Sequence, residues 1–566
     1  MDRRTFLKSA GMVGAAPAVG ESSPQFFSNS NRNRSNIQST DLTPWTPSAA
    51  QTWDVHTINH LYRRAGFGAT LAEIADAQGK NYSDVIDALL NDAFLTQPTV
   101  PPLPSYSDDT TAPPSWLHVP PYAYNNLLQQ ELDYLSATMK IRSHWTVQMN
   151  QPGTMLREKL TLFWMNHFVI EAKKVIWPQM SYNFLSYIRQ HAWGNFKKMV
   201  SDITTLPAML YYLDGVISVG SSPNENYARE LQELFTMGVY YKNDVSKPNY
   251  TQADVEAIAA ALTGWTIDYQ APSPNVLPAV YDVTLHNSSL VSIYDGVTRQ
   301  YNLTASGASM DMDLFDHMFA LDQRGNQIAW FICSELYQFF VYHDITSPDA
   351  QSVIDAMAAL FIQSNWELKP VISALLKSAH FFEEANIGAE IKSPYEHLIG
   401  LLRTFDIQID ELEGGTLVYY SISGNQELLD PPNVKGWPGY HTWISTTTLP
   451  YREYIQSALL SPLGVIPSLG GSDGYSSANL YKSIYLPDIL TWAQQFTNYN
   501  GTFDDFVTEV ATYLCAQLPS KNALDNFVKY GYPSGYEWAS LKDADKITTL
   551  RVITGRIMSL ADYQLS

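Results

Sequence analysis

Residues 155–174 read MLREKLTLFWMNHFVIEAKK, and this stretch has the period of an α-helix. Leu156, Leu160 and Phe163 recur at spacings of four and three residues, which places them on one helix face. His167 continues the same apolar stripe one turn later. Because helical periods of this kind dominate the chain, the sequence predicts a mainly α, multi-helical globular protein.

Two further helices are marked by residues that favour helix starts. Ser222 stands before Pro223 and is the expected N-cap of a helix over 224–237. Thr251 caps the next helix in the same way. Residues 266–310 interrupt the helical pattern, since VSIYDGVTRQYNL reads as strand, Asp-Gly turn and strand. We therefore expect a small β-hairpin insertion near 266–310.

Composition divides the chain into four parts. The expected parts are a signal peptide over 1–20, a disordered Ser- and Asn-rich leader over 21–50, a helical core over 51–460 that contains the β insertion, and a C-terminal helical part over 461–566 packed on that core. The proline-dense residues 101–123 should form an extended surface loop.

The N-terminus has the features of an export signal. Residues 3–8 read RRTFLK and precede a short, weakly apolar segment that ends in the small-residue pattern Ala16-Pro17-Ala18. This combination is typical of the twin-arginine route, which exports proteins already folded. Outside this segment the sequence has no run of about 18 apolar residues. We expect a periplasmic or extracellular protein without a membrane span.

Charge and cysteine content exclude several classes of partner and site. The formal net charge of −21 disfavours nucleic acid, whose phosphates an acidic surface repels. Cys333 and Cys515 are the two cysteines and both occupy apolar helical contexts, so a cysteine-built zinc or iron–sulfur site is excluded. The 35 Tyr, 23 Phe and 14 Trp could stack on sugars or peptides, or could simply fill the core.

The densest polar cluster lies in NENYARELQELF. Glu225, Arg229 and Glu233 are four residues apart and can form an ion-pair ladder along one helix face. Glu230 borders the apolar stripe of the same helix. Two readings stay open: a solvated, salt-bridged surface, or a cleft in which Glu230 and Glu233 bind a metal ion or divide acid and base roles.

Histidines and one loop supply the remaining candidates. His167 is either a hydrogen-bonded core residue or part of a site, and His56 and His60 have the spacing of two ligands on one helix turn. Residues 431–452, PPNVKGWPGYHTWISTTTLPYR, form a Gly- and Pro-stiffened loop. This loop either carries a site or folds inward, with its tryptophans filling the core. Its candidate side chains are Lys435, Trp437, His441, Trp443 and Arg452.

Six segments in this order resemble one bacterial family. They are HLYRRAGFGAT (60–70), LREKLTLFWMNHFV (156–169), NENYARELQELFTMGV (224–239), YTQADVEAIAAALTGW (250–265), IKSPYEHLIGLLRTF (391–405) and PPNVKGWPGYHTWI (431–444). Through these six segments the chain resembles the bacterial protein family called domain of unknown function 1800. This resemblance implies an exported, mostly helical protein without an established reaction, often encoded beside an exported sulfatase-like or phosphatase-like protein.

The chain departs from the pattern of that family at two places. Met165 stands where many members have a second histidine, and His286-Asn287 stands where a His-Asp pair tends to occur. Both departures remove potential metal ligands. A divalent metal ion is therefore one option, but the sequence specifies no cofactor.

Two functions follow from these observations. The favoured one is a non-catalytic binding or assembly partner for a surface polysaccharide or for a neighbouring sulfatase-like or phosphatase-like protein. The alternative is an exported metal-assisted or acid–base hydrolase of a surface polymer. Its catalytic candidates are His167, Glu230, Glu233 and His441, and its substrate-binding candidates are Arg229, Lys435, Trp437, Trp443 and Arg452. In either case we expect the segments 156–171, 223–237 and 431–443 to meet around one cleft.

Replacing Arg3 and Arg4 together with lysine should keep the precursor in the cytoplasm, because lysine does not reproduce the planar guanidinium pair that the receptor reads. Cell fractionation followed by immunoblotting measures this. Normal export of the double variant would contradict the twin-arginine assignment.

Overall fold

The computed structural model describes residues 41–92, 127–269, 277–301, 303–306, 309–467, 482–531 and 537–566. All of these belong to one unit, 38–566. The signal peptide, the leader up to residue 40 and the proline-dense segment 101–123 lie outside the described residues.

Helices make up most of this unit. The described residues contain 22 α-helices and are 58% helical, which confirms the prediction of a mainly α fold. The first half contains α2 (Val55–Arg64), α3 (Leu71–Gln78), α4 (Tyr82–Leu90), α5 (Leu127–Asn150), α6 (Met155–His167), α7 (Ala172–Val175), α8 (Pro178–Gln190), α9 (Phe196–Thr205), α10 (Pro207–Tyr212), α11 (Glu225–Glu233) and α12 (Gln252–Ala261). The second half contains α13 (Asp313–Phe319), α14 (Gly325–Phe340), α15 (Pro348–Gln363), α16 (Leu368–Lys377), α17 (Pro394–Thr404), α18 (Glu411–Ser423), α19 (Thr448–Leu459), α20 (Ile489–Ala493), α21 (Phe503–Leu514), α22 (Lys521–Gly531) and α23 (Asp543–Met558).

The β insertion consists of three separate antiparallel pairs. They are β1 (Trp265–Ile267) with β2 (Ala279–Tyr281), β3 (Val291–Ser292) with β4 (Thr298–Arg299), and β5 (Leu303–Ser306) with β6 (Ser309–Met312). The expected hairpin is the second pair, and Gly296 in its turn has a φ of +74°. A fourth pair, β7 (Val465–Ile466) with β8 (Ile484–Tyr485), lies in the C-terminal part, where the sequence indicated only helices and loops.

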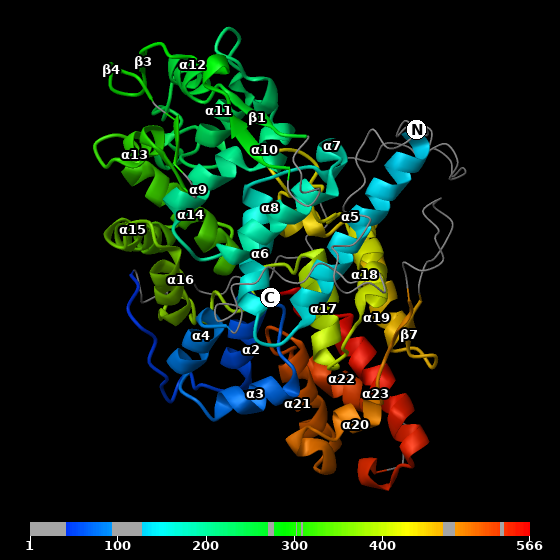
Figure 1. Ribbon diagram of the computed structural model, residues 1–566. Coiled ribbons are helices and arrows are strands. Elements are labelled where there is room, and N and C mark those ends of the chain that lie inside the picture. Colours follow the sequence, from blue (N-terminus) through cyan, green and yellow to red (C-terminus); the bar gives the residue numbers. More distant parts are fainter. Residues whose placement is uncertain are drawn as a thin grey trace, which may run out of the picture. The chain divides into compact units, whose positions relative to one another are not determined.

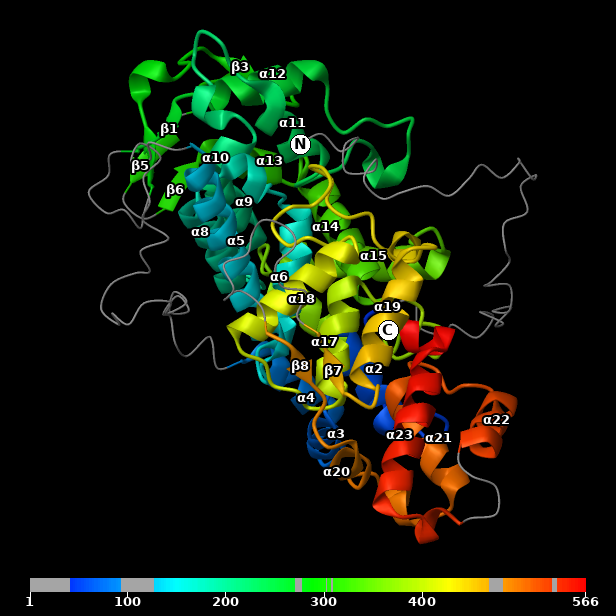
Figure 2. The same cartoon turned by 90° about the vertical axis from the view of Figure 1, so that its right-hand side faces the viewer.

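The order of elements is the same in both views of the unit. Figure 1 places α11 and α12 at one end and α20 to α23 at the other, with α6, α8, α17 and α18 between them. Figure 2 shows this order after a quarter turn. The C-terminal helices contact the N-terminal ones directly: Arg63 at the end of α2 donates to the carbonyl oxygens of Tyr513 and Cys515, at 2.7 and 2.9 Å.

Helix α6 lies inside the core. Every residue of α6 is buried except Asn166, so its charged residues also lie out of water. Their charges are paired. Glu158 accepts from Trp145 of α5 and from Arg189 of α8, while Arg157 donates to Asp92 at 2.9 and 3.0 Å. Since an unpaired buried charge is strongly destabilising, these pairs allow a helix with several charged residues to form the centre of the fold.

Two local expectations need correction. The predicted disordered leader ends earlier than residue 50, because Trp45 is buried and stacks on Phe382 with ring centroids 4.4 Å apart. The N-cap of α11 is Asn224 and not Ser222, since the Asn224 side chain accepts from the amide of Asn226. Thr251 forms the expected capping box with Asp254 at the start of α12. Both cysteines are buried and free.

Within the described part of the chain, no helix is long and apolar enough to cross a membrane.

Candidate functional site

The loop after α18 is fixed to α6 by a single amide side chain. Asn166 accepts a hydrogen bond from the backbone N–H of Trp437 at 2.6 Å and donates one to its carbonyl oxygen at 3.3 Å. The backbone approaches so closely because residue 436 is glycine: a Cβ there would lie 2.2 Å from Asn166 Oδ1, and φ is +79°. The Asn166 side chain thus pairs with the N–H and C=O of one loop residue, as the backbone of a neighbouring β-strand would.

The loop then turns over the end of α14. Gly439 has a φ of +73°, and Tyr440 takes a left-handed conformation with a φ of +47° at the start of the 3₁₀ turn Tyr440–Trp443. A left-handed backbone is costly for a bulky residue. The Tyr440 ring stacks on His343, just beyond α14, with centroids 3.4 Å apart. This contact with the neighbouring segment helps to hold the strained residue in place.

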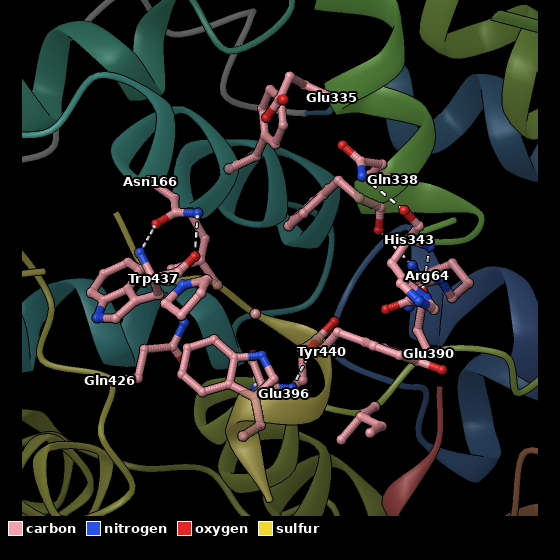
Figure 3. Close-up of a pocket in the computed structure, with 18 of the residues that line it drawn as sticks. Arg64, Asn166, Glu335, Gln338, His343, Glu390, Glu396, Gln426, Trp437 and Tyr440 are labelled. Carbon is pink, nitrogen blue, oxygen red and sulfur yellow. Dashed lines mark hydrogen bonds and ion pairs between the residues drawn. The ribbon is translucent and has the colours of Figure 1, made fainter. Parts of the chain in front are cut away.

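A cavity of about 350 Å³ lies between this loop, α6 and α14. Its walls come from segments far apart in the sequence, as Figure 3 shows. The contributing side chains and backbones are Arg64 of α2; Leu162, Phe163 and Asn166 of α6; Glu335, Gln338 and Phe339 of α14; His343; Glu390, Ile391, Ser393, Glu396 and Gln426; and Lys435, Trp437, Pro438, Gly439, Tyr440 and Trp443.

Most charged groups of the wall already have partners. Arg64 donates to the carbonyl oxygens of Phe339 and Phe340, and to Ser566 Oγ at 2.7 Å. Glu396 forms an ion pair with the buried Lys159. Although burial acts to raise the pKa of Glu396, Lys159 and Arg64 hold it at about 2.

The second wall carboxylate is also paired. Glu390 Oε1 accepts from the backbone N–H of His343 at 2.7 Å and lies 3.4 Å from its Nδ1. Together with the stacked Tyr440, this contact fixes the His343 ring between the loop and residue 390.

Glu335 differs from these groups. Within the described residues its carboxylate has no hydrogen-bond or ion-pair partner, and in Figure 3 it stands apart from the connected residues His343 and Glu390. Glu335 is half-buried, and its partial removal from water raises the pKa of its carboxyl to about 7. A carboxyl that is half protonated near neutral pH can donate or accept a hydrogen bond, or exchange a proton.

A second cavity adjoins the first. It has a volume of about 340 Å³, and Glu335, Gln338 and His343 line both spaces. Its other walls are Asn243, Phe331, Ser334, Asp344, Ile345 and Thr346. The end of α14 therefore separates two neighbouring compartments, and Glu335 is accessible from each.

The helix α11 meets the loop at the rim of this region. Lys435 Nζ lies 3.7 Å from Glu233 Oε1, and Tyr250 donates to Glu233 Oε2 at 3.1 Å. Burial and the neighbouring Glu233 raise the pKa of Glu230, while Lys435 and Arg229 act against this rise. Arg229 pairs with Glu225 at 3.0 Å, as one step of the expected ladder.

His167 connects α6 to the end of α11 but does not line either cavity. Its Nε2 lies 3.0 Å from the carbonyl oxygen of Phe235, and aromatic rings surround the imidazole. Burial lowers its pKa to about 4, so the ring is neutral at physiological pH. The three segments therefore do come together, with His167 in the position of a hydrogen-bonded core histidine.

The remaining loop candidates have different environments. Trp437 and Trp443 are 6% and 7% exposed and present parts of their rings to the cavity, so the loop is folded inward. His441 has its ring centroid 6.0 Å from that of His343 and is outside the cavity wall. Arg452 is buried in α19, donates to the carbonyl oxygen of Lys392 at 2.7 Å, and does not line the cavity.

Metal ligands do not cluster in the described residues, where no group of three or more His, Cys, Asp or Glu side chains could hold an ion. His60 is buried beside the carbonyl oxygen of Phe381, and burial lowers its pKa to about 3. His286 lies 3.0 Å from the carbonyl oxygen of Thr263, and Asn287 donates to that of Gly220. Met165 is a core residue.

Sequence reasoning missed Glu335, His343, Arg64 and Glu390. The only signal for Glu335 was a carboxylate within the apolar stretch AWFICSELYQFF, where burial of a charge demands an explanation. The other three residues come from unrelated segments, and their proximity follows only from the fold.

Comparisons with known proteins identify a family and an export signal. A family model described as "Protein of unknown function (DUF1800)" matches residues 60–565, and a model of the twin-arginine translocation signal sequence matches residues 1–20. A search of curated proteins and a search of solved structures both return no match.

Replacing Gly436 with alanine should lower the thermal midpoint clearly more than replacing Gly153. Both glycines have positive φ, +79° and +84°, but a Cβ at 153 meets open space whereas one at 436 meets Asn166. The shared backbone cost is about 1 kcal/mol, and the clash adds to it only at 436. Thermal unfolding of the two variants measures the difference. Equal losses would show that the close approach to Asn166 is unimportant.

Replacing Glu335 with glutamine should stabilise the protein at high pH. Because the folded-state pKa lies near 7, above the ordinary value of 4.5, wild-type stability falls as pH rises through this interval. Glu335→Gln lacks this loss, so its advantage should be small near pH 4.5 and about 1–3 kcal/mol at pH 8. Urea unfolding at both pH values measures it, with the exposed Glu453→Gln on α19 as the control. An advantage that does not change with pH would contradict an unpaired, desolvated carboxyl.

Proposed function

The chain belongs to the protein family of unknown function DUF1800 and carries a twin-arginine export signal, and we propose that it binds a polar surface glycan in the cavity beside α14. The observation that supports this proposal is the wall of that cavity. Aromatic rings line it together with amide and carboxyl side chains, and three of these rings come from the loop that Asn166 fixes to α6.

The aromatic part of the wall supports a ligand with flat, weakly polar faces. Trp437, Tyr440 and Trp443 come from the loop, and Phe163 and Phe339 come from the opposite helices. Tyr and Trp offer an apolar ring together with a polar group, which suits a sugar whose faces are apolar and whose edges carry hydroxyls. The volume is at the lower end of the range for small-molecule sites, so one or two sugar units are the appropriate size.

The position of the tryptophans favours a ligand inside the cavity over a protein partner on the loop. A docking surface needs its large aromatic side chains accessible, but Trp437 and Trp443 are buried. Binding of a neighbouring exported sulfatase-like or phosphatase-like protein would therefore have to use other residues. Lys435 lines the cavity and its side chain is 69% exposed, so the rest of a polymer could extend into solvent past this residue.

A second candidate is a hydrolase that acts on the same polymer. The specific observation is Glu335, whose pKa of about 7 suits a general acid or base at neutral pH. A glycan that binds would then also be cut, with new reducing ends as the product, and Glu335→Gln would abolish cutting while binding remained. If bound glycan stays intact for hours, the hydrolase function is excluded and only the binding function remains.

Replacing Tyr440 with alanine should weaken glycan binding about tenfold or more, equivalent to about 1.4 kcal/mol, because it removes the ring that stacks on His343 and closes the cavity. The wild-type protein is first applied to an array of bacterial surface glycans, and the best ligand is then titrated by calorimetry. Tyr485→Ala is the matched control, since Tyr485 is 62% exposed on β8 and lies outside the cavity.

Two results would contradict the proposal. One is the absence of binding to any glycan on the array by correctly folded protein. The other is a bound glycan whose affinity is the same in the Tyr440→Ala and Tyr485→Ala variants, because the ligand would then occupy another surface.

A further inference from the structure

Among the charged side chains that line the first cavity, Glu335 is the one for which the described residues supply no hydrogen-bond or ion-pair partner. Each of the other charged groups of the first cavity has one: Arg64 with backbone carbonyls, Glu390 with His343, Glu396 with Lys159, and Lys435 with Glu233. In the second cavity Asp344 accepts from the amide and hydroxyl of Thr346. A carboxyl that neither caps a helix nor pairs with a cation contributes nothing evident to folding.

No cation of the described cavity wall neutralises Glu335. Burial alone accounts for its raised pKa, and neither Arg64 nor Lys435 acts on it. A lone carboxyl in such a site lowers stability whenever it ionises, and a group of this kind is retained most readily where it serves a ligand. A positive charge on the ligand would supply the missing partner.

Aromatic rings complete the setting for a cation. Phe163, Phe339 and Tyr440 line the first cavity, and Phe331 lines the second. The faces of such rings attract ammonium groups, and the attraction grows when water is excluded. The net charge of −21 further concentrates cations around the molecule.

We propose that the ligand carries a positively charged amine, such as the free amino group of an amino sugar, and that Glu335 is its counter-ion at the junction of the two cavities. This inference rests on the proposed glycan binding and names the class of glycan. When the ammonium group enters, a protonated Glu335 carboxyl releases its proton to solvent, and the resulting carboxylate forms an ion pair with the ammonium group. One proton is therefore released for each protein molecule whose Glu335 was protonated before binding.

The test compares two tetrasaccharides that differ only at nitrogen. Wild-type protein is titrated at about pH 6 with the glucosamine tetramer, whose amines are charged, and with the N-acetylglucosamine tetramer, whose amides are neutral. Wild type should bind the amine form at least about tenfold more tightly and release protons on binding. Calorimetry in two buffers of different ionisation enthalpy detects this release.

The variants assign the preference to one residue. Glu335→Gln should lose both the preference for the amine form and the proton release. Glu453→Gln removes one exposed carboxylate and should behave like wild type, which controls for net charge. Since Glu335→Gln relieves a desolvated charge, it should fold at least as stably as the parent.

Each remaining outcome is decisive. Equal affinity for the two tetramers, or a preference that survives in Glu335→Gln, overturns the counter-ion role and leaves glycan binding intact. If neither tetramer binds but the array yields glycans without an amine, the counter-ion role of Glu335 is again wrong, while the proposed glycan binding stands. If no glycan binds at all, the proposed function fails and the inference fails with it.

Discussion

The hydrogen bonds between Asn166 and the backbone of Trp437 are the contact on which the site depends. Asn166 is the one residue of α6 that is not fully buried, and its amide pairs with both backbone polar groups of Trp437. With residue 437 fixed in this way, Lys435 reaches α11, Trp437 faces the cavity and Tyr440 stacks on His343. One side chain therefore connects the central helix, the rim and the loop that closes the cavity.

The cavity exists only in the folded protein, which suits the route of export. Its wall runs from Arg64 in α2 to Trp443, and buried ion pairs such as Arg157 with Asp92 hold the intervening helices together. Twin-arginine transport carries folded cargo, and a core with this many paired charges and aromatic residues must be assembled as a whole.

The sequence predicted the architecture better than the chemistry. Helical period and capping residues are local properties, so α6, the Thr251 cap and the Asp-Gly hairpin could be recognised from short stretches. The convergence of α6, α11 and the 431–443 loop could also be anticipated, because all three combine polar side chains with rigid framing. The orientation of the side chains could not be predicted from the sequence. His167 has a core environment, and the unpaired carboxyl is Glu335, because partner choice depends on contacts between residues far apart in the chain.

A crystal structure of the protein soaked with an amine-bearing oligosaccharide would show whether the cavity binds an amino sugar beside Glu335. We expect a sugar ring in the cavity against Trp437, Tyr440 and Trp443, with its amino nitrogen within hydrogen-bonding distance of the Glu335 carboxylate. An oligosaccharide bound only elsewhere on the surface, with the cavity filled by water, would contradict it.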